Sequence, residues 1–209
     1  MEIVLMADQL NEGRDPEYLA SPIARLIDRA QSGDTTAFDQ IVISHQHRVV
    51  ALAWRLLGNQ DDARDAAQEA FLRVYKHLKK FDPTQDFSGW LYRIVVNVCR
   101  DLARKRRSNV SSFEAEIEAG AIQEPASPLN TEAAAMAAQE QAIVLKALAT
   151  LTEKERAAIV LRDLEGLATD EVARILGSSP TTVRSQISSA RAKIRAFRSR
   201  YVAARGPKR

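Results

Sequence analysis

The chain has 209 residues, of which 45% are hydrophobic and only 6% aromatic, and its formal net charge is +3. This length and apolar fraction suffice for one large or two small globular domains with a buried core. An abundance of helix formers beside only eight glycines favours helix over sheet, so we expect an all-α fold. Cys99 is the single cysteine, which excludes an intramolecular disulfide and a Cys-x-x-Cys metal or redox motif.

Residues 1–20 form a predicted N-terminal extension. Their short apolar run is interrupted by Asp8 and Glu12, and they lack the basic leader and long apolar region of a signal peptide. No window approaches the roughly 20 apolar residues that a membrane-spanning helix needs. We therefore expect no direct membrane insertion and a reducing, cytoplasmic location.

Residues 21–107 are predicted to form a first helical domain. Ser21 and Pro22 have the chemistry of a helix start, and Gly33 provides a stop. Beyond it, apolar residues recur at helical spacing until Gly58 and Asn59 break the pattern. After the loop FDPTQDFSG, a last helix carries an apolar stripe and a separate basic stripe. The predicted helices cover about residues 21–31, 34–57, 61–78 and 88–107.

Residues 108–132 are predicted to form a flexible acidic linker. No Lys or Arg occurs from Ser108 to Leu145, whereas several Glu and the prolines Pro125 and Pro128 lie there. Fully extended at ~3.3 Å per residue, this linker would reach on the order of 80 Å. It would let two domains occupy widely separated sites on a partner. A second domain is expected over residues 133–202, followed by a basic tail over 203–209.

The second domain has the spacing of a helix-turn-helix. Thr152 and Glu155 form a capping-box pattern, which predicts a helix to about Leu164. A short helix over about residues 170–176 ends at Gly177. Ser178, Ser179 and Pro180 then supply capping residues and a rigid first turn for the last helix.

The last helix has the two faces that a DNA-recognition helix needs. Val183, Ile187 and Ala190 share an apolar stripe with Ile194 and Phe197, while short polar and Arg side chains lie away from it. The stripe would hold the helix on its scaffold while the polar residues reach bases and phosphates. A small bundle with a solvated polar face is the alternative, and the basic tail favours DNA only weakly.

Two long stretches carry a family resemblance. LTEKERAAIVLRDLEGLATDEVARILGSSPTTVRSQISSARAKIR resembles region 4, the C-terminal DNA-binding domain of sigma factors. GNQDDARDAAQEAFLRVYKHLKKFDPTQDFSGWLYRIVVNVCRDLARKRR resembles region 2 of the extracytoplasmic-function class within the sigma-70 superfamily. Both stretches occur in the family's order, with a linker between them. The resemblance implies two helical domains, region 2 over residues 21–107 and region 4 over residues 133–202.

The resemblance implies that the helix bearing DAAQEAF docks on the largest catalytic subunit of RNA polymerase. An exposed apolar residue among hydrogen-bond acceptors suits a basic helical partner. Without the rest of the motif, a solvated acidic helix face would be the default interpretation. The candidate polymerase-binding residues are Asp65, Gln68, Glu69 and Leu72.

The resemblance also implies promoter melting by the loop from Phe81 to Phe87 and by the helix that follows. Bases that lose their stacking partners can be received by aromatic and basic side chains. For Trp90 we favour packing in the core over stacking on a base. Asn97 and Arg100 are the favoured DNA contacts. The candidate −10 DNA-binding residues are Trp90, Tyr92, Arg93, Asn97, Arg100 and Arg104.

Region 4 of the family reads the −35 element through the start of its recognition helix. The candidate −35 DNA-binding residues here are Thr181, Thr182, Arg184, Ser185, Ser188 and Arg191. The chain departs from the family at Gln186, Ser188 and Ser189, where many members carry an extra basic or aromatic residue. A standard −35 sequence is therefore not expected.

These features predict an alternative sigma factor, which binds core RNA polymerase, directs it to specific promoters and helps to open DNA. The resemblance implies an anti-sigma factor as a further partner, which could hold the chain at the membrane. No enzymatic activity, small-molecule substrate or cofactor is expected, because no phosphate-binding loop or nucleophile–base arrangement emerges. A metal is not expected either, since His45 and His47 point to different helix faces and His77 has no ligand partner.

Two other classes remain as alternatives. A helix-turn-helix repressor or activator would use its N-terminal helices for dimerisation or ligand binding and would bind DNA without polymerase. The DAAQEAF helix followed by FSGWLYRIVVN argues against such a regulator. A helical adaptor would need neither the two basic surfaces nor a terminal DNA-reading helix.

Overall fold

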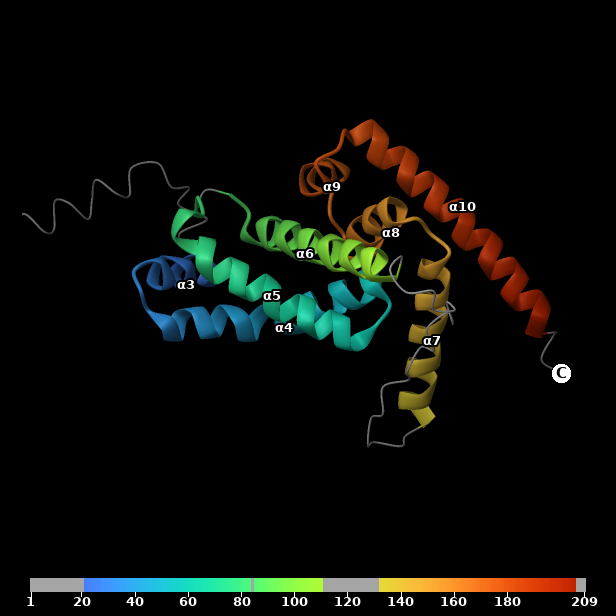
Figure 1. Cartoon of the computed structure of the whole chain (residues 1–209), viewed down its shortest axis with the longest axis horizontal. Coiled ribbons are helices and arrows are strands. Elements are labelled where there is room, and N and C mark those ends of the chain that lie inside the picture. Colours follow the sequence, from blue (N-terminus) through green and yellow to red (C-terminus); the bar gives the residue numbers. More distant parts are fainter. Residues whose placement is uncertain (1–20, 84, 111–131, 206–209) are drawn as a thin grey trace, which may run out of the picture.

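The computed structural model describes residues 21–83, 85–110 and 132–205. Over these residues the chain is helical, without a β-strand, as the composition predicts. It forms two helical domains, as the family resemblance implies (Figure 1). The predicted N-terminal extension, most of the predicted linker and the end of the basic tail lie outside the described residues. Within the described ranges, no helix combines the length and apolar character needed to cross a membrane.

The first domain consists of four α-helices and one short 3-10 turn. Its elements are α3 (Pro22–Gln31), α4 (Thr35–Leu57), α5 (Gln60–His77), η1 (Leu78–Lys80) and α6 (Phe87–Val110). These elements agree with the predicted helices to within one residue, except that α6 continues to Val110. Local caps explain the boundaries at the start of α4 and between α4 and α5. Asp34 accepts from the amides of Thr36 and Ala37, and left-handed Gly58 ends α4 before Asn59 caps α5.

The first domain encloses an apolar core between α4, α5 and α6. Leu52 on α4, Val74 on α5 and Leu91 on α6 are fully buried in one cluster. Small residues on α5, Ala63, Ala66 and Ala70 among them, let the neighbouring helices approach closely. This arrangement presents the opposite faces of α5 and α6 for contacts outside the core.

The second domain begins with the long helix α7 and ends with the long helix α10. Its elements are α7 (Glu132–Ala149), α8 (Glu153–Ile159), the π-helical turn η2 (Val160–Leu164), α9 (Thr169–Leu176) and α10 (Pro180–Arg205). Thr152 and Glu155 form the predicted capping box at the start of α8. Gly177 adopts a left-handed conformation with φ 61° and ends α9, so that α9 and α10 form the predicted helix-turn-helix.

The two domains pack against each other. α9 lies over α6, while α7, α8 and η2 contact α4 near its C-terminal end (Figure 1). Buried side chains of both domains belong to one continuous apolar cluster. The face of α6 toward the second domain is therefore covered in this conformation.

Candidate nucleic-acid interface

The start of α10 presents polar side chains to solvent. Ser179 accepts from the amide of Thr182 at 3.1 Å and so caps the helix, and Pro180 occupies its first turn. Val183, Ile187 and Ala190 are buried against the domain, as the apolar stripe predicts. All six predicted −35 residues are exposed and form a row on the other face: Thr181, Thr182, Arg184, Ser185, Ser188 and Arg191.

Four arginines surround a hollow beside this row. Arg184, Arg191, Arg162 and Arg195 line a cavity of about 430 Å³ together with Thr169, Ile187 and Ser188. Arg191 donates to both carboxylate oxygens of Asp163 at 2.9 and 2.7 Å, and these hydrogen bonds raise the pKa of Arg191. A hollow of this charge suits a phosphate backbone. Arg162 and Arg195 were not among the predicted −35 residues, although Arg195 lies four residues after Arg191 on the same face.

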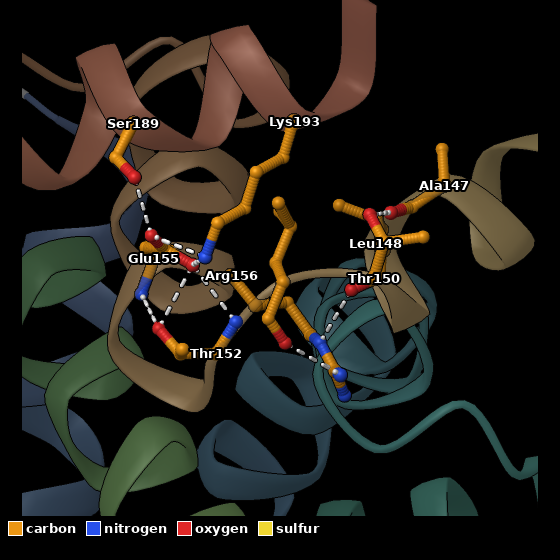
Figure 2. Close-up of polar contacts among 9 residues, drawn as sticks. Ala147, Leu148, Thr150, Thr152, Glu155, Arg156, Ser189 and Lys193 are labelled. Atoms are coloured by element: carbon orange, nitrogen blue, oxygen red, sulfur yellow. Dashed lines mark hydrogen bonds and ion pairs between the residues drawn. The ribbon is translucent and has the colours of Figure 1, made fainter. Parts of the chain in front are cut away.

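Glu155 joins the first turn of α8 to the middle of α10. Its carboxylate accepts from the amide and the hydroxyl of Thr152, from Ser189 Oγ at 2.6 Å and from Lys193 Nζ at 2.7 Å (Figure 2). The hydrogen bond from Lys193, followed by that from Ser189, lowers the pKa of Glu155 to about 2. Because hydrogen bonds are directional, this network fixes the rotation of α10 on its scaffold.

Arg156, the next residue, points away from α10. Its guanidinium donates to the carbonyls of Leu148 at 3.0 Å, Leu151 at 3.3 Å and Leu56 at 2.8 Å, and Figure 2 shows it beside the α7–α8 turn. Burial of the guanidinium lowers its pKa. Leu56 belongs to the last turn of α4, whose carbonyls have no partner within the helix. Arg156 thus ties the second domain to the first.

The N-terminus of α6 is built on Asp86. Its carboxylate accepts from the amides of Ser88 at 3.1 Å and Gly89 at 2.6 Å, which caps the helix. A Cβ at position 89 would lie 2.8 Å from the Asp86 carboxylate, so glycine suits this close approach. The cap places Trp90 and Arg93 within the first two turns.

Trp90 packs in an aromatic cluster, as its place at the helix start predicts. Its ring lies 4.7 Å from that of Phe81 and 5.8 Å from that of Phe87, between ring centroids. Trp90 stays partly exposed and lines a cavity of about 450 Å³ with Arg93, Glu171 and Arg174. This cavity lies between α6 and α9.

The remaining predicted −10 residues divide into two groups. Asn97 and Arg104 are exposed, and Arg104 donates to Asp101 at 2.6 Å. Tyr92 and Arg100 instead face the second domain. The Tyr92 side chain is buried, and desolvation followed by the nearby Glu165 carboxylate raises the pKa of its phenol. The structure thus brings the six candidates onto one helix but not onto one free face.

The face of α5 opposite the core combines acidic, amide and apolar side chains. Asp65, Gln68 and Leu72 are exposed there, and Leu72 is 48% exposed. Glu69 is half-buried and accepts from Arg73 at 2.7 Å. Tyr75, three residues after Leu72, is also exposed and enlarges the apolar surface. Tyr75 was not among the predicted polymerase-binding residues, although its spacing of three from Leu72 places the two residues on one face.

Comparison with known proteins matches both domains. The family model for sigma-70 region 2 matches residues 41–109, and the model for sigma-70 region 4 matches residues 141–194. The solved structure of CnrH in complex with the cytosolic domain of CnrY is 30% identical, with a TM-score of 0.61. This similarity covers 84% of the present chain and 96% of CnrH.

The chain belongs to the sigma-70 family. Within this family it groups with the extracytoplasmic-function sigma factors. It is 38% identical over 111 residues to the RNA polymerase sigma-H factor of Pseudomonas aeruginosa, a match covering 50% of this chain and 58% of the relative. It is 39% identical over 95 residues to SigW of Bacillus subtilis, covering 46% and 50% respectively. The matches thus span about half the length of these curated relatives.

A second solved structure supports the assignment of the chain to the sigma-70 family. The sigma factor RpoE of Bartonella quintana, in complex with the anti-sigma factor NepR, has a TM-score of 0.64 and 25% identity. The similarity covers 78% of the present chain and 96% of RpoE. The region 2 match contains α5 and all of α6 but its last residue, and the region 4 match contains most of the helix-turn-helix.

Proposed function

We propose that this chain is an alternative sigma factor, which binds core RNA polymerase, directs it to specific promoters and promotes DNA opening. The observation that carries the proposal is the combination of two surfaces in one chain. One is the exposed acidic and apolar face of α5, and the other is the basic helix-turn-helix. A repressor or activator has use for the second surface only.

The face of α5 fits a polymerase subunit that presents a basic helix. Leu72 supplies an exposed apolar anchor, and Asp65, Gln68 and Glu69 supply acceptors around it. An apolar centre with complementary charge at its rim is typical of protein interfaces. Tyr75 extends the anchor and joins this proposed docking surface.

Promoter recognition is assigned to two separate surfaces. The exposed row at the start of α10 would read the −35 element, with the four-arginine hollow holding phosphates. The basic stripe of α6 and the cluster around Trp90 would receive the opened −10 strand. RNA synthesis itself belongs to the polymerase, so the chain acts as an initiation factor.

Control by an anti-sigma factor forms part of the proposal. Both CnrH, solved with the cytosolic domain of CnrY, and RpoE, solved with NepR, support such a partner. We place the protein in the cytoplasm, either free or held at the membrane through an anti-sigma factor.

The test is transcription with purified bacterial core polymerase, with and without the protein, across a library of promoter sequences. Specific transcripts that depend on the protein are expected, and their sequences would reveal both DNA elements. Leu72→Ala should reduce the yield from every promoter, whereas Arg184→Ala should act mainly on the −35 preference. Specific DNA binding without core binding or initiation would instead identify a conventional repressor or activator.

A further inference from the structure

Arg73 joins the proposed docking surface on α5 to the neighbouring helix α6. Its Nε donates to Glu69 Oε1 at 2.7 Å, one helical turn back on α5. Its Nη1 donates to Asp101 Oδ2 at 3.2 Å, on α6. One guanidinium therefore bridges a predicted polymerase-binding residue and a carboxylate of another helix. Neither Arg73 nor Asp101 was among the predicted site residues.

Asp101 is held in place from two sides. Its other oxygen, Oδ1, accepts from Arg104 Nη2 at 2.6 Å, so each oxygen of the carboxylate has a partner. Val98, three residues earlier on α6, is fully buried in the apolar core that α6 shares with α5. This segment of α6 is therefore fixed relative to α5, and Asp101 gives Arg73 a stationary partner.

The guanidinium group transmits this fixed position to Glu69. A guanidinium is planar, and its N–H donors point in fixed directions. Because Nε and Nη1 belong to the same plane, the hydrogen bond to Asp101 restricts the direction in which Nε meets Glu69. A Glu–Arg pair on one exposed helix face, without a third partner, would leave both side chains free to rotate.

Glu69 retains acceptor capacity for a bound protein. Within the described part of the chain, the polar contact of its carboxylate is the single hydrogen bond from Arg73 to Oε1. A carboxylate has about four lone-pair sites, so Oε2 can accept from a cationic side chain of a partner. Leu72 lies three residues later on the same side of α5 and is exposed. Glu69 thus lies at the rim of the apolar anchor.

The exposure of the bridge favours a role in binding over a role in stability. The side chains of Arg73 and Glu69 are 36% and 45% exposed, and ion pairs this exposed add little to folding. A carboxylate that is already ordered does, however, lose less conformational entropy when a partner immobilises it. The benefit of the bridge is therefore expected in the complex and not in the isolated chain.

We propose that Arg73 is a positioning residue for polymerase binding, which holds the Glu69 carboxylate in the orientation that meets the partner. Asp101 anchors Arg73, and Arg73 itself does not contact polymerase. The inference rests on the proposed function, because it takes the face of α5 as the docking surface. A residue of α6, the helix that carries the basic stripe, thereby contributes to core binding.

Arg73→Lys separates the position of the side chain from its charge. Lysine keeps the positive charge, but its single ammonium group lacks the planar fork that meets Glu69 and Asp101 together. Surface plasmon resonance with purified bacterial core polymerase measures binding of the full-length variant. The dissociation rate should rise about fivefold, whereas the association rate should stay at the wild-type value, because electrostatic steering depends on charge.

Two further variants accompany this measurement. Asp101→Ala removes the anchor on α6 and should raise the dissociation rate by a similar factor, although residue 101 lies on another helix. Arg29→Lys is the matched control, since it makes the same substitution in the exposed Arg29–Asp34 pair of α3, and it should dissociate at the wild-type rate. Far-UV circular dichroism establishes that each variant is folded. Asp101→Ala carries the test if Arg73→Lys is not folded.

A double-mutant cycle identifies the residue through which Arg73 acts. In the Glu69→Ala background, Arg73→Lys should change the dissociation rate by less than about twofold, because no carboxylate remains to be positioned. In the Asp65→Ala background, the full effect of Arg73→Lys should persist. A full effect in the Glu69→Ala background would mean that Arg73 touches polymerase or acts through the fold, and it would overturn the proposal.

Failure of the positioning role can be told apart from failure of the proposed function. Weaker core binding by Glu69→Ala and Leu72→Ala, together with wild-type dissociation of Arg73→Lys and Asp101→Ala, would overturn the positioning role alone. Absence of core binding by the wild-type protein would overturn the proposed function as well.

Discussion

The first domain is held together by apolar packing between α4, α5 and α6, whereas the second combines a smaller apolar core with a polar network around Glu155. Apolar contacts are non-directional and tolerate small rotations of a helix. The hydrogen bonds that Ser189 and Lys193 donate to Glu155 are directional and do not tolerate such rotations. The domain whose helix is proposed to read base edges is thus the one with a directional constraint on that helix. The two domains should therefore respond differently to substitution.

The largest effect is expected in the apolar core of the first domain. Leu91 is fully buried on α6, so Leu91→Ala should lower the free energy of unfolding by about 3 kcal/mol through lost burial and a residual cavity. Urea unfolding followed by tryptophan fluorescence measures it, since both Trp54 and Trp90 lie in this domain. The control, Ile43→Ala at an exposed site, should change stability by less than about 0.5 kcal/mol. Equal losses would contradict the core assignment.

A smaller loss is expected from the polar network of the second domain. Glu155→Gln leaves Lys193 without its ionic partner, and because Lys193 is partly exposed we expect a loss of about 2 kcal/mol. Thermal unfolding followed by far-UV circular dichroism measures the change. Glu140→Gln, an exposed site on α7, should melt like the wild type. If both variants melted alike, the network would not support this domain.

The same carboxylate predicts a dependence of stability on pH. The pKa of Glu155 is about 2 in the folded protein, below its ordinary value of 4.5, so its ionised form stabilises the fold. This contribution is fully present above pH 4.5 and is lost as the pH falls toward 2. Unfolding as a function of pH in Glu155→Gln should lack that part of the acid destabilisation. An unchanged acid profile would argue that other carboxylates control it.

A helix cap should have a still smaller and local effect. Asn59 accepts from the amide of Asp62 and caps α5, so Asn59→Ala should lower stability by about 1 kcal/mol. Asn59→Ser, which retains a capping oxygen, should recover most of the loss in urea unfolding. Failure of serine to rescue would mean that position 59 acts through something other than its cap.

The smallest effect on stability is expected at the proposed docking surface. Leu72 is 48% exposed, so Leu72→Ala should change the unfolding free energy by less than about 0.5 kcal/mol. Its affinity for core polymerase, measured by surface plasmon resonance, should nevertheless fall about tenfold, as for an apolar interface anchor. Val202→Ala, at an exposed apolar site on α10, provides the control. Unchanged core binding by Leu72→Ala would remove this residue from the docking surface.

The features that could be predicted from the sequence are mostly local. Gly58, Asn59 and the Thr152–Glu155 capping box set helix ends within a few residues of themselves, so their signals are visible in the chain. The apolar stripe of α10 predicts its buried face for the same reason. Trp90 also packs as its position at the start of α6 predicts.

The features that escaped prediction depend on residues far apart in the chain. Glu155 was predicted as a cap, but its partners Ser189 and Lys193 lie 34 and 38 residues away. Tyr92 was grouped with the DNA-binding stripe, yet its environment is set by Glu165, 73 residues later. No helical periodicity encodes such pairs, because they arise only when the two domains meet.

Because α10 is long, a small tilt of this helix moves its C-terminal end by a larger distance. Its 26 residues span about 39 Å at 1.5 Å per residue, and Ala190 is the last of its described side chains that is fully buried. Val202, 60% exposed, lies about 18 Å farther along the axis at the same rise. A tilt of about 10° at the Glu155 anchor would displace position 202 by about 3 Å over that helical length. A spin label at position 202 would therefore amplify reorientations of the recognition helix that are too small to detect at its base-reading end.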